Sequence, residues 1–312
     1  GVAKDRIVSV HDPDMRHGRK SSSKRFDGHK LAIAVEAESQ LITAVEVLPG
    51  NAPDREKALE LVEESEQNTG MEAEEVIGDC AYGDGMTRKK FKEGGRQLVA
   101  KVARRRNGKQ FSKDAFEIDL EAMTCRCPGG HVTGKLVGNG RHREQDGKYR
   151  HRKAFQFAGH VCDTCELRPQ CTRAGPGKGR MVALHPQERL LQEARALQNS
   201  PEFREYNEKR QAAEHRLARL VQLGMRQARY FGRKKTLFQA RIAATVANLT
   251  LVAAKTPQGQ EDRTEPGPAA LFFSHAKRTS DMIRHYTSSL IASFSPFSTP
   301  NGHPNPSFRL GF

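Results

Sequence analysis

Two apolar runs with a period of two stand side by side near the start of the chain. Residues 29–36 and 41–48 carry apolar side chains at almost every second position, and the polar stretch AESQ separates them. This alternation is typical of β-strands, and the short polar link predicts a β-hairpin. Residues 6–12 form a shorter run of the same kind, which predicts a strand that ends on Asp12.

Helical and strand-like patterns alternate after this hairpin. Apolar residues within 51–65 recur at helical spacing. Residues 74–79 predict a short strand that ends at Asp79, just before a Tyr-Gly turn. A short helix at 85–95 and a further strand at 96–103 follow. This alternation of strands and helices favours an α/β fold with a mixed sheet.

The pattern changes after this point. Residues 104–180 are Gly-rich, basic and Cys-containing with little periodicity, so we interpret them as an insertion. A helix is predicted at 185–198. Another is expected from Ser200, as its N-cap, to a stop at Gly224.

The last part of the chain changes composition once more. An apolar helix at 235–254 is expected to pack on the sheet. From residue 256 the chain is rich in Pro, Ser, Gly and Asn, which predicts a largely disordered tail in which 280–294 is able to fold locally. The chain therefore divides into four predicted regions: the first part of a core (1–103), a Cys-containing insertion (104–184), the C-terminal helices of the core (185–255) and the tail (256–312).

Charge narrows the class of partner. Lys plus Arg outnumber Asp plus Glu by 52 to 37, and the excess of +15 recurs along the chain rather than in one tail. Spread positive charge suits a polyanion, most often nucleic acid, although a solvated basic surface is the alternative. We find no uninterrupted run of about 18 apolar residues and no signal peptide, so we expect no membrane span and a cytoplasmic location. Because the chain begins with Gly1, we expect it to be a fragment.

Three acidic residues stand where chemistry would need them. Asp12 and Asp79 each end an apolar strand pattern, and Glu214 interrupts the apolar face of a predicted helix. An unpaired buried carboxylate is costly, and a divalent cation removes that cost. Mg²⁺ or Mn²⁺, held by such carboxylates, can activate a water or hydroxyl in phosphodiester chemistry.

Each acid also has a purely structural interpretation. Asp12 lies in the sequence HDPD, a good turn, where Asp14 competes with it for the same role. Asp79 precedes another turn-like stretch. Glu214 follows Arg210 by one helical turn, so an ordinary ion pair explains it equally well.

Three segments together resemble a known family. The stretch IGDCAYGDGMTRKKFKEGG is similar to the second-aspartate motif of bacterial insertion-sequence transposases of the DDE type. The stretch YNEKRQAAEHRLARLVQLGMRQARYFG resembles their third-acid helix, and DGHKLAIAVEAESQLITAVEVLPGNAPD resembles the hairpin between the first two acids. The likeness covers about residues 6–255.

The resemblance implies an RNase H-like mixed sheet flanked by helices, with the insertion before the last catalytic helix. It implies that Asp12, Asp79 and Glu214 are the catalytic, Mg²⁺-binding or Mn²⁺-binding triad of a DNA transposase that works as a homodimer in a bacterial, nucleoid-associated setting. It also implies contacts to DNA, which we assign to four basic or aromatic residues: Tyr206, Arg210, Arg216 and Arg226.

Two features depart from the family. The Lys that often follows the Glu by seven residues is replaced by Val221, so Arg216, Arg219 or Arg226 would have to support the DNA. We expect the N-terminal helical DNA-binding region of the family to be missing from this chain, and the first acid is Asp12, Asp14 or a residue upstream of it. Two other functions therefore stay open: a catalytically incomplete, transposase-derived DNA-binding protein, and a nuclease that cuts without joining.

The cysteines suggest a second metal. Five of the six lie in the insertion with the spacings C-x-C and C-x2-C-x5-C, namely Cys125, Cys127, Cys162, Cys165 and Cys171. Four thiolates can hold one tetrahedral Zn²⁺, and a loop-rich segment gains stability from it. The alternative is a set of packed thiols, and the choice among the five cysteines, His131 and His160 stays open. We expect Cys80, beside Asp79, to be a small buried residue.

Overall fold

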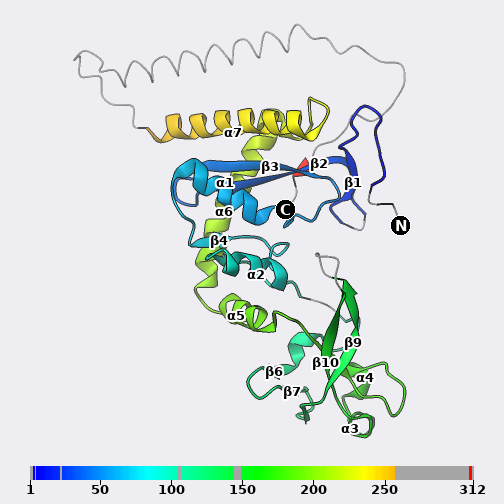
Figure 1. Ribbon diagram of the computed structural model, residues 1–312. Coiled ribbons are helices and arrows are strands. Elements are labelled where there is room, and N and C mark those ends of the chain that lie inside the picture. The colour runs from blue at the N-terminus through cyan, green and yellow to red at the C-terminus, as the bar shows by residue number, and fades with distance from the viewer. Residues whose placement is uncertain are drawn as a thin grey trace, which may run out of the picture. The chain divides into compact units, whose positions relative to one another are not determined.

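The computed structural model of the protein describes residues 3, 5–21, 23–104, 107–143, 149–256 and 309–310. These residues form a mixed α/β structure with several small sheets, which agrees with the predicted class at this level (Figure 1). The chain divides into two compact units, residues 1–248 with 307–312 and residues 249–306. Of the second unit only 249–256 are described. The predicted disordered tail and its segment 280–294 therefore lie almost wholly outside the described residues.

The predicted hairpin is confirmed. Strands β2 (Arg25–Val35) and β3 (Ile42–Pro49) pair antiparallel, with Ala32 opposite Glu46. The strand β1 (Arg16–Arg19) pairs antiparallel with the start of β2, and β12 (Arg309–Leu310) pairs parallel with its middle. These four strands form one sheet.

The strand predicted at residues 6–12 is wrong. This segment forms no strand: its backbone is irregular and bends at Val10 and His11. The Ser9 hydroxyl accepts hydrogen bonds from the backbone N–H groups of His11 and Asp12, each at 3.2 Å. A side chain that bonds its neighbouring backbone offers an alternative to a strand ladder, and here that alternative is preferred.

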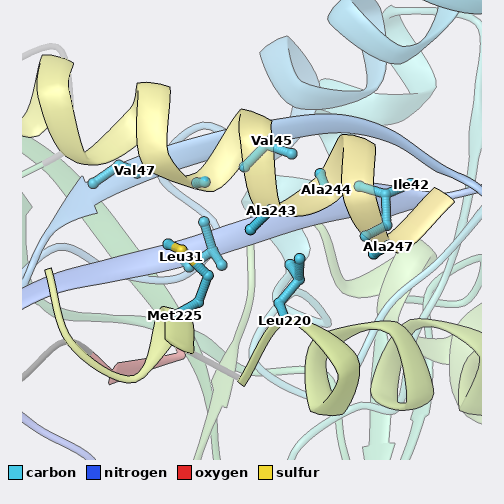
Figure 2. Close-up of a cluster of buried hydrophobic side chains, with 10 residues drawn as sticks. Leu31, Ile42, Val45, Val47, Leu220, Met225, Ala243, Ala244 and Ala247 are labelled. Carbon is cyan, nitrogen blue, oxygen red and sulfur yellow. The ribbon is translucent and has the colours of Figure 1, made fainter. Parts of the chain in front are cut away.

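A long helix covers one face of the hairpin. Helix α7 (Arg233–Lys255) lays a stripe of alanines on the sheet, together with the end of helix α6 (Phe203–Leu220) (Figure 2). The buried cluster comprises Leu31, Ile42, Val45, Val47, Leu220, Met225, Ala240, Ala243, Ala244 and Ala247. Alanines at helical spacing let the helix axis approach the strands closely, so the predicted packing of this apolar helix on the sheet is confirmed.

Helix α7 also passes a test for a membrane span. It is the one helix among the described residues that is long and apolar enough to cross a bilayer, by length and composition. A core helix passes the same test, and the buried alanine stripe of α7 is what a helix packed on a sheet shows. Its outer face exposes Phe238 and Ile242. From the sequence we expect no segment that could span a membrane, whereas α7 meets the criteria of length and composition.

The other face of the hairpin carries helix α1 (Ala58–Thr69). Thr43 on β3 shares a hydrogen bond of 2.6 Å with Ser65 on α1. Ala58 and Val62 of α1 also pack with helix α2 (Gly85–Glu93) and strand β5 (Gln97–Val99) in a second buried cluster, which comprises Ala58, Val62, Phe91, Leu98 and Ala100.

Strand β4 (Glu75–Ile77) pairs parallel with β5, and the two form a separate small sheet among the described residues. The predicted strands and the short helix between them are therefore present, and the strands are shorter than expected. Because the hairpin sheet and the β4–β5 pair are not joined into one sheet, the RNase H-like arrangement stays a prediction.

The Cys-containing segment builds its own small core. Its described residues form two antiparallel three-stranded sheets, a 3₁₀ turn and two short helices. The elements are η1 (Lys113–Ala115), β6 (Glu117–Asp119), β7 (Thr124–Arg126), β8 (Val132–Thr133), β9 (Leu136–Arg143), β10 (Tyr149–Gln156), α3 (Gly159–Asp163), α4 (Arg168–Cys171) and β11 (Met181–Leu184). A buried cluster around Phe116, Phe155 and Phe157 holds the sheets together.

The helices that follow are close to the prediction. Helix α5 (Glu188–Gln198) precedes α6, which the wide turn η2 (Val221–Met225) ends. Gly224 has a φ of 90°, so it supplies the predicted stop. Ser200 is not the N-cap, because α6 begins after Glu202 and Ser200 lies in the preceding turn.

Candidate functional site

Asp79 sits in a turn that its neighbours fix tightly. The turn follows β4, and one Asp79 carboxylate oxygen accepts a hydrogen bond of 2.7 Å from the backbone N–H of Ala81. Gly83 closes the turn, where a Cβ atom would lie 2.0 Å from the carbonyl oxygen of Lys101. Only glycine fits at this approach of two backbones, so the sequence GDCAYG specifies the position of the carboxylate.

A buried arginine anchors the same turn. Arg88 of α2 donates hydrogen bonds to the carbonyl oxygens of Gly83 (3.1 Å), Leu98 (2.9 Å) and Ala100. Three carbonyl acceptors stabilise one guanidinium and tie the turn after Asp79 to the end of β5. The site therefore rests on rigid elements rather than on a free loop.

Helix α6 faces this turn across two neighbouring cavities. The smaller has a volume of about 160 Å³, and its walls include Asp79, Lys101, Tyr206 and Arg210. The larger, of about 450 Å³, shares Asp79 and Arg210 and adds Glu214 at its rim. Asp79 thus stands opposite a helix face on which Tyr206, Arg210 and Glu214 recur at one-turn intervals.

Tyr206 and Arg210 on this helix face each interact with a glutamate. The Tyr206 hydroxyl donates a hydrogen bond of 2.7 Å to Glu75 of β4. Arg210 Nη1 lies 2.5 Å from Glu214 Oε1. The structural interpretation of Glu214 as the ion-pair partner of Arg210 therefore holds here. Its side chain is 47 % exposed, so Glu214 does not point into a core as the helical pattern predicts.

The electrostatics of Asp79 differ from those of a surface aspartate. Burial raises the pKa of Asp79 above its ordinary value, and the nearby carboxylate of Asp54 raises it further, while Arg210 opposes the shift. Asp54 is itself held by Lys30 at 2.7 Å. Burial likewise raises the pKa of Tyr82, with Asp54 and Asp79 contributing. Two carboxylates that repel each other in a half-buried place are typical of functional sites.

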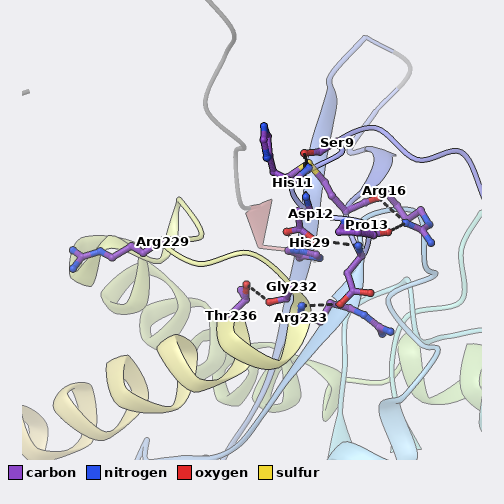
Figure 3. A network of polar contacts seen from close by, with 12 residues as sticks. Ser9, His11, Asp12, Pro13, Arg16, His29, Arg229, Gly232, Arg233 and Thr236 are labelled. Atoms are coloured by element: carbon purple, nitrogen blue, oxygen red, sulfur yellow. Dashed lines mark hydrogen bonds and ion pairs between the residues drawn. The ribbon is translucent and has the colours of Figure 1, made fainter. Parts of the chain in front are cut away.

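Asp12 has a different environment (Figure 3). Its side chain is 1 % exposed, and Oδ2 accepts a hydrogen bond of 3.0 Å from His29 Nε2. Burial opposes the charged form, but the backbone N–H of Gly232 and the His29 ring outweigh it, so the pKa of Asp12 is lowered. Asp14, the competing first acid, accepts a hydrogen bond of 3.1 Å from the backbone N–H of Arg233.

The structure does not gather the three predicted acids. Asp12 lines neither of the two cavities next to Asp79. In the part of the chain that the structure describes, no three His, Cys, Asp or Glu side chains are placed to hold a metal ion. Asp54 affects Asp79 through its charge, but like Asp12 it lines neither cavity, so the described residues show no assembled cation site.

The predicted DNA contacts divide into two groups. Tyr206, Arg210 and Arg226 are partly or fully exposed, and the first two face the cavities. Arg216 is only 6 % exposed, and burial lowers its pKa. It therefore offers no surface to a ligand here, because the helix turns it toward the interior together with Leu217.

Among the cysteines the structure makes a distinction that spacing cannot make. Cys125 is fully buried beside Phe155, and burial raises the pKa of its thiol to about 11. The other four of the segment line a small cavity with His131, namely Cys127, Cys162, Cys165 and Cys171. Cys80 is exposed, so its expected burial is wrong; it follows Asp79 in the turn and lines the smaller cavity.

Two polar residues of the site were not expected from the sequence. Asp54 follows Pro53 in the loop before α1, and Lys101 follows β5, with its ammonium group 5.8 Å from the centre of the Phe203 ring. Neither lies in a periodic pattern. The only signal is that each follows an apolar strand or turn, which is too common to single them out.

A carboxylate opposite a tyrosine and an arginine suits the handling of phosphate groups. Residues 126–253 match the family described as transposase DDE domain, which is about two fifths of the chain. No curated protein and no solved structure gives a significant match. The match supports a DDE transposase, as the resemblance predicts, and indicates a function in DNA transposition. The matched region contains α6 and the C-x2-C-x5-C cysteines, but neither Asp12 nor Asp79.

Proposed function

We propose that the protein is a transposase that cuts DNA at the ends of a mobile element and joins the freed 3′ ends to a target. In this proposal the work is centred on Asp79 and on the face of α6 opposite it. One observation carries the proposal: Asp79 and Arg210 line the same two cavities. A carboxylate with a raised pKa therefore lies opposite an arginine that can bind phosphate.

Asp79 and Asp54 are the carboxylates that would bind a divalent cation, Mg²⁺ or Mn²⁺. Mg²⁺ in enzymes that act on phosphates takes one or two carboxylates together with the substrate's own oxygens, so a complete protein cage is not needed. A bound cation would offset both the burial and the charge of Asp54, which together raise the pKa of Asp79. When bound, such an ion supplies activation of a nucleophile and stabilisation of the leaving oxygen.

Tyr206 and Arg210 are the groups that would position the DNA backbone. A phosphate is a stronger partner for Arg210 than an exposed carboxylate, because the guanidinium can bind it through two parallel hydrogen bonds. When Arg210 turns to a phosphate, Glu214 is released one helical turn away, on the rim of the same cavity. Glu214 then completes the acidic set. Lys101 lies at the smaller cavity and adds positive charge there.

A second function is favoured by one specific observation. Asp12 is bound in its own network with His29, and it does not join Asp79. A transposase-derived protein that grips DNA without cutting it would show this arrangement. The resemblance to DDE transposases also predicts that the protein binds DNA as a homodimer. Sedimentation of the protein–DNA complex would measure the number of chains bound.

Cleavage and binding must therefore be measured on the same samples. The substrate is a plasmid that carries this gene with its native flanking DNA, and the products are separated and sequenced. The proposal expects nicked ends and joined products with Mg²⁺ or Mn²⁺, and cut ends that are never joined would show a nuclease instead. Glu214→Gln should lose cleavage and keep DNA binding.

The matched control is Glu208→Gln. Glu208 pairs with Arg204 at the same four-residue spacing on the same helix, outside both cavities. Its substitution should leave cleavage unchanged. If wild-type protein binds DNA with a steep salt dependence and yields no product with either metal, the DNA-binding function is the correct one.

A further inference from the structure

The four cysteines that share a cavity come from two separate parts of the Cys-containing segment. Cys127 follows β7, whereas Cys162, Cys165 and Cys171 lie on α3, in the turn after it, and at the end of α4. The void between them has a volume of about 20 Å³, room for one small ion or water. We call it the four-cysteine cavity.

The backbone at Cys127 turns its sulfur toward this cavity. The N–H of Gly130 donates to the carbonyl oxygen of Cys127, and the N–H of Cys127 donates to that of His131, both at 2.9 Å. A Cβ atom on Gly129 would lie 3.3 Å from Cys165 Sγ and 3.7 Å from Cys127 Sγ. The two sulfurs therefore flank one point in space, and a glycine leaves room for them there.

The other three cysteines sit on connected turns. The N–H of Cys165 donates to the carbonyl oxygen of Cys162 at 3.3 Å, and the N–H of Arg168 donates to that of Cys165 at 3.0 Å. Helix α4 then brings Cys171 back to the cavity after a single turn. These short elements have little apolar burial of their own, since none of the residues of α3 and α4 is fully buried.

Positive charge surrounds the cavity. Arg168 and Arg180 line it, and the backbone N–H of Arg180 donates to Cys162 Sγ at 3.5 Å. The Arg180 guanidinium donates to the carbonyl oxygen of Cys171 at 2.9 Å. Four thiolates around a divalent ion leave a net charge of −2, and N–H donors and arginines next to the sulfurs stabilise that charge.

We propose that one structural Zn²⁺ is bound by four thiolates: those of Cys127, Cys162, Cys165 and Cys171. Cys125 is excluded because it is fully buried in the apolar cluster around Phe155 and does not line the cavity. In the described residues no three of these side chains are yet placed at metal-binding distances, so the four sulfurs must close on the cavity to form zinc–sulfur bonds of about 2.3 Å. The ion joins β7 to the two short helices and stabilises a segment that has a small core. This inference is independent of the proposed function.

The first test measures metal in the full-length chain, purified without chelator, by native mass spectrometry and atomic absorption. We expect one zinc per chain. Cys162→Ser and Cys171→Ser should lower the content to background, whereas Cys80→Ser and Cys125→Ser should keep one zinc. Retention of zinc in both cavity variants, or a zinc-free wild-type chain with six reduced thiols, would overturn the proposal.

A second measurement on the wild-type protein covers the case in which the variants fail to fold. Replacement of zinc by Co²⁺ should give the visible spectrum and intense sulfur-to-metal charge transfer of a tetrahedral four-thiolate site, unchanged in His131→Ala. A spectrum with nitrogen ligation that His131→Ala alters would refute the four-thiolate assignment. Two disulfides among these cysteines, seen by intact mass, would refute the site itself.

Discussion

Asp12 and Asp79 look alike in the sequence, since each follows an apolar run and begins a turn, yet the structure gives them opposite environments. Asp12 is buried and satisfied by His29 and Gly232, and its pKa is lowered. Asp79 is half-buried, faces two cavities and has a raised pKa next to Asp54. A carboxylate whose charge is compensated by hydrogen bonds stabilises the fold. A carboxylate whose charged form is disfavoured by its surroundings becomes more stable when it binds a cation, which is typical of functional sites.

The largest effect is expected at Asp79. The substitution Asp79→Asn keeps the size of the side chain and removes its charge, so cleavage should fall by more than about 100-fold while DNA binding persists. Strand cleavage and gel-shift assays on one preparation measure both. Cleavage by Asp79→Asn at the wild-type rate would remove Asp79 from the chemistry.

Asp12→Asn tests the other side of the comparison. It weakens a buried charge-assisted hydrogen bond, so we expect a loss of about 2–3 kcal/mol in the free energy of unfolding, measured by urea denaturation. Because the pKa of Asp12 is lowered in the folded state, its contribution is present above the ordinary value of 3.8 and is lost as the pH falls below it. An unchanged stability together with lost cleavage would restore Asp12 as a catalytic residue.

A smaller effect is expected on the DNA-binding face of α6. Arg210→Gln removes one phosphate contact, so affinity should fall uniformly across sequences, by about 1 kcal/mol, and the salt slope should decrease by about 1. Arg204→Gln, on the same helix but outside both cavities, is the matched control. If the two substitutions weakened DNA binding equally, the loss would come from the reduced positive charge and not from a specific phosphate contact of Arg210.

The smallest expected effect is the contribution of Asp79 to the pH dependence of the free energy of unfolding. The raised pKa of Asp79 means that the folded state holds its proton more tightly than the unfolded chain, so stability falls as the pH rises through the interval above 3.8. At neutral pH Asp79→Asn should therefore melt slightly higher than wild type, and the difference should vanish at pH values below that interval. A lower melting temperature at neutral pH would show that the charge of Asp79 is stabilising.

The sequence predicts the elements better than it predicts their assembly. The β2–β3 hairpin follows from strict alternation, and α2 with its flanking strands follows from apolar spacing between glycines. The segment before Asp12 has the same alternation and forms no strand, because the Ser9 hydroxyl binds the neighbouring backbone. The spacing of apolar residues indicates which side chains are buried, but it does not reveal local hydrogen bonds that compete with a strand.

The site shows the same limit. Asp79, Tyr206 and Arg210 could be identified from motifs, because a fixed turn and helical spacing determine where they point. The effect of Asp54 on the pKa of Asp79 depends on how the fold places two charges that are distant in sequence, and no local pattern encodes it. Arg216, which we assigned to DNA contact from the resemblance, is buried for a related reason, since the neighbours that α6 meets decide which of its residues stay exposed.

The most direct test is a calorimetric titration with Mn²⁺ of the full-length chain and of Asp12→Asn, Asp54→Asn, Asp79→Asn and Glu214→Gln, with and without DNA. We predict that Asp79→Asn abolishes cation binding, that Asp54→Asn weakens it, and that folded Asp12→Asn binds the cation as the wild type does. Glu214→Gln should weaken binding only when DNA is present. Wild-type binding by Asp79→Asn, or its loss in a folded Asp12→Asn protein, would contradict a cation site centred on Asp79.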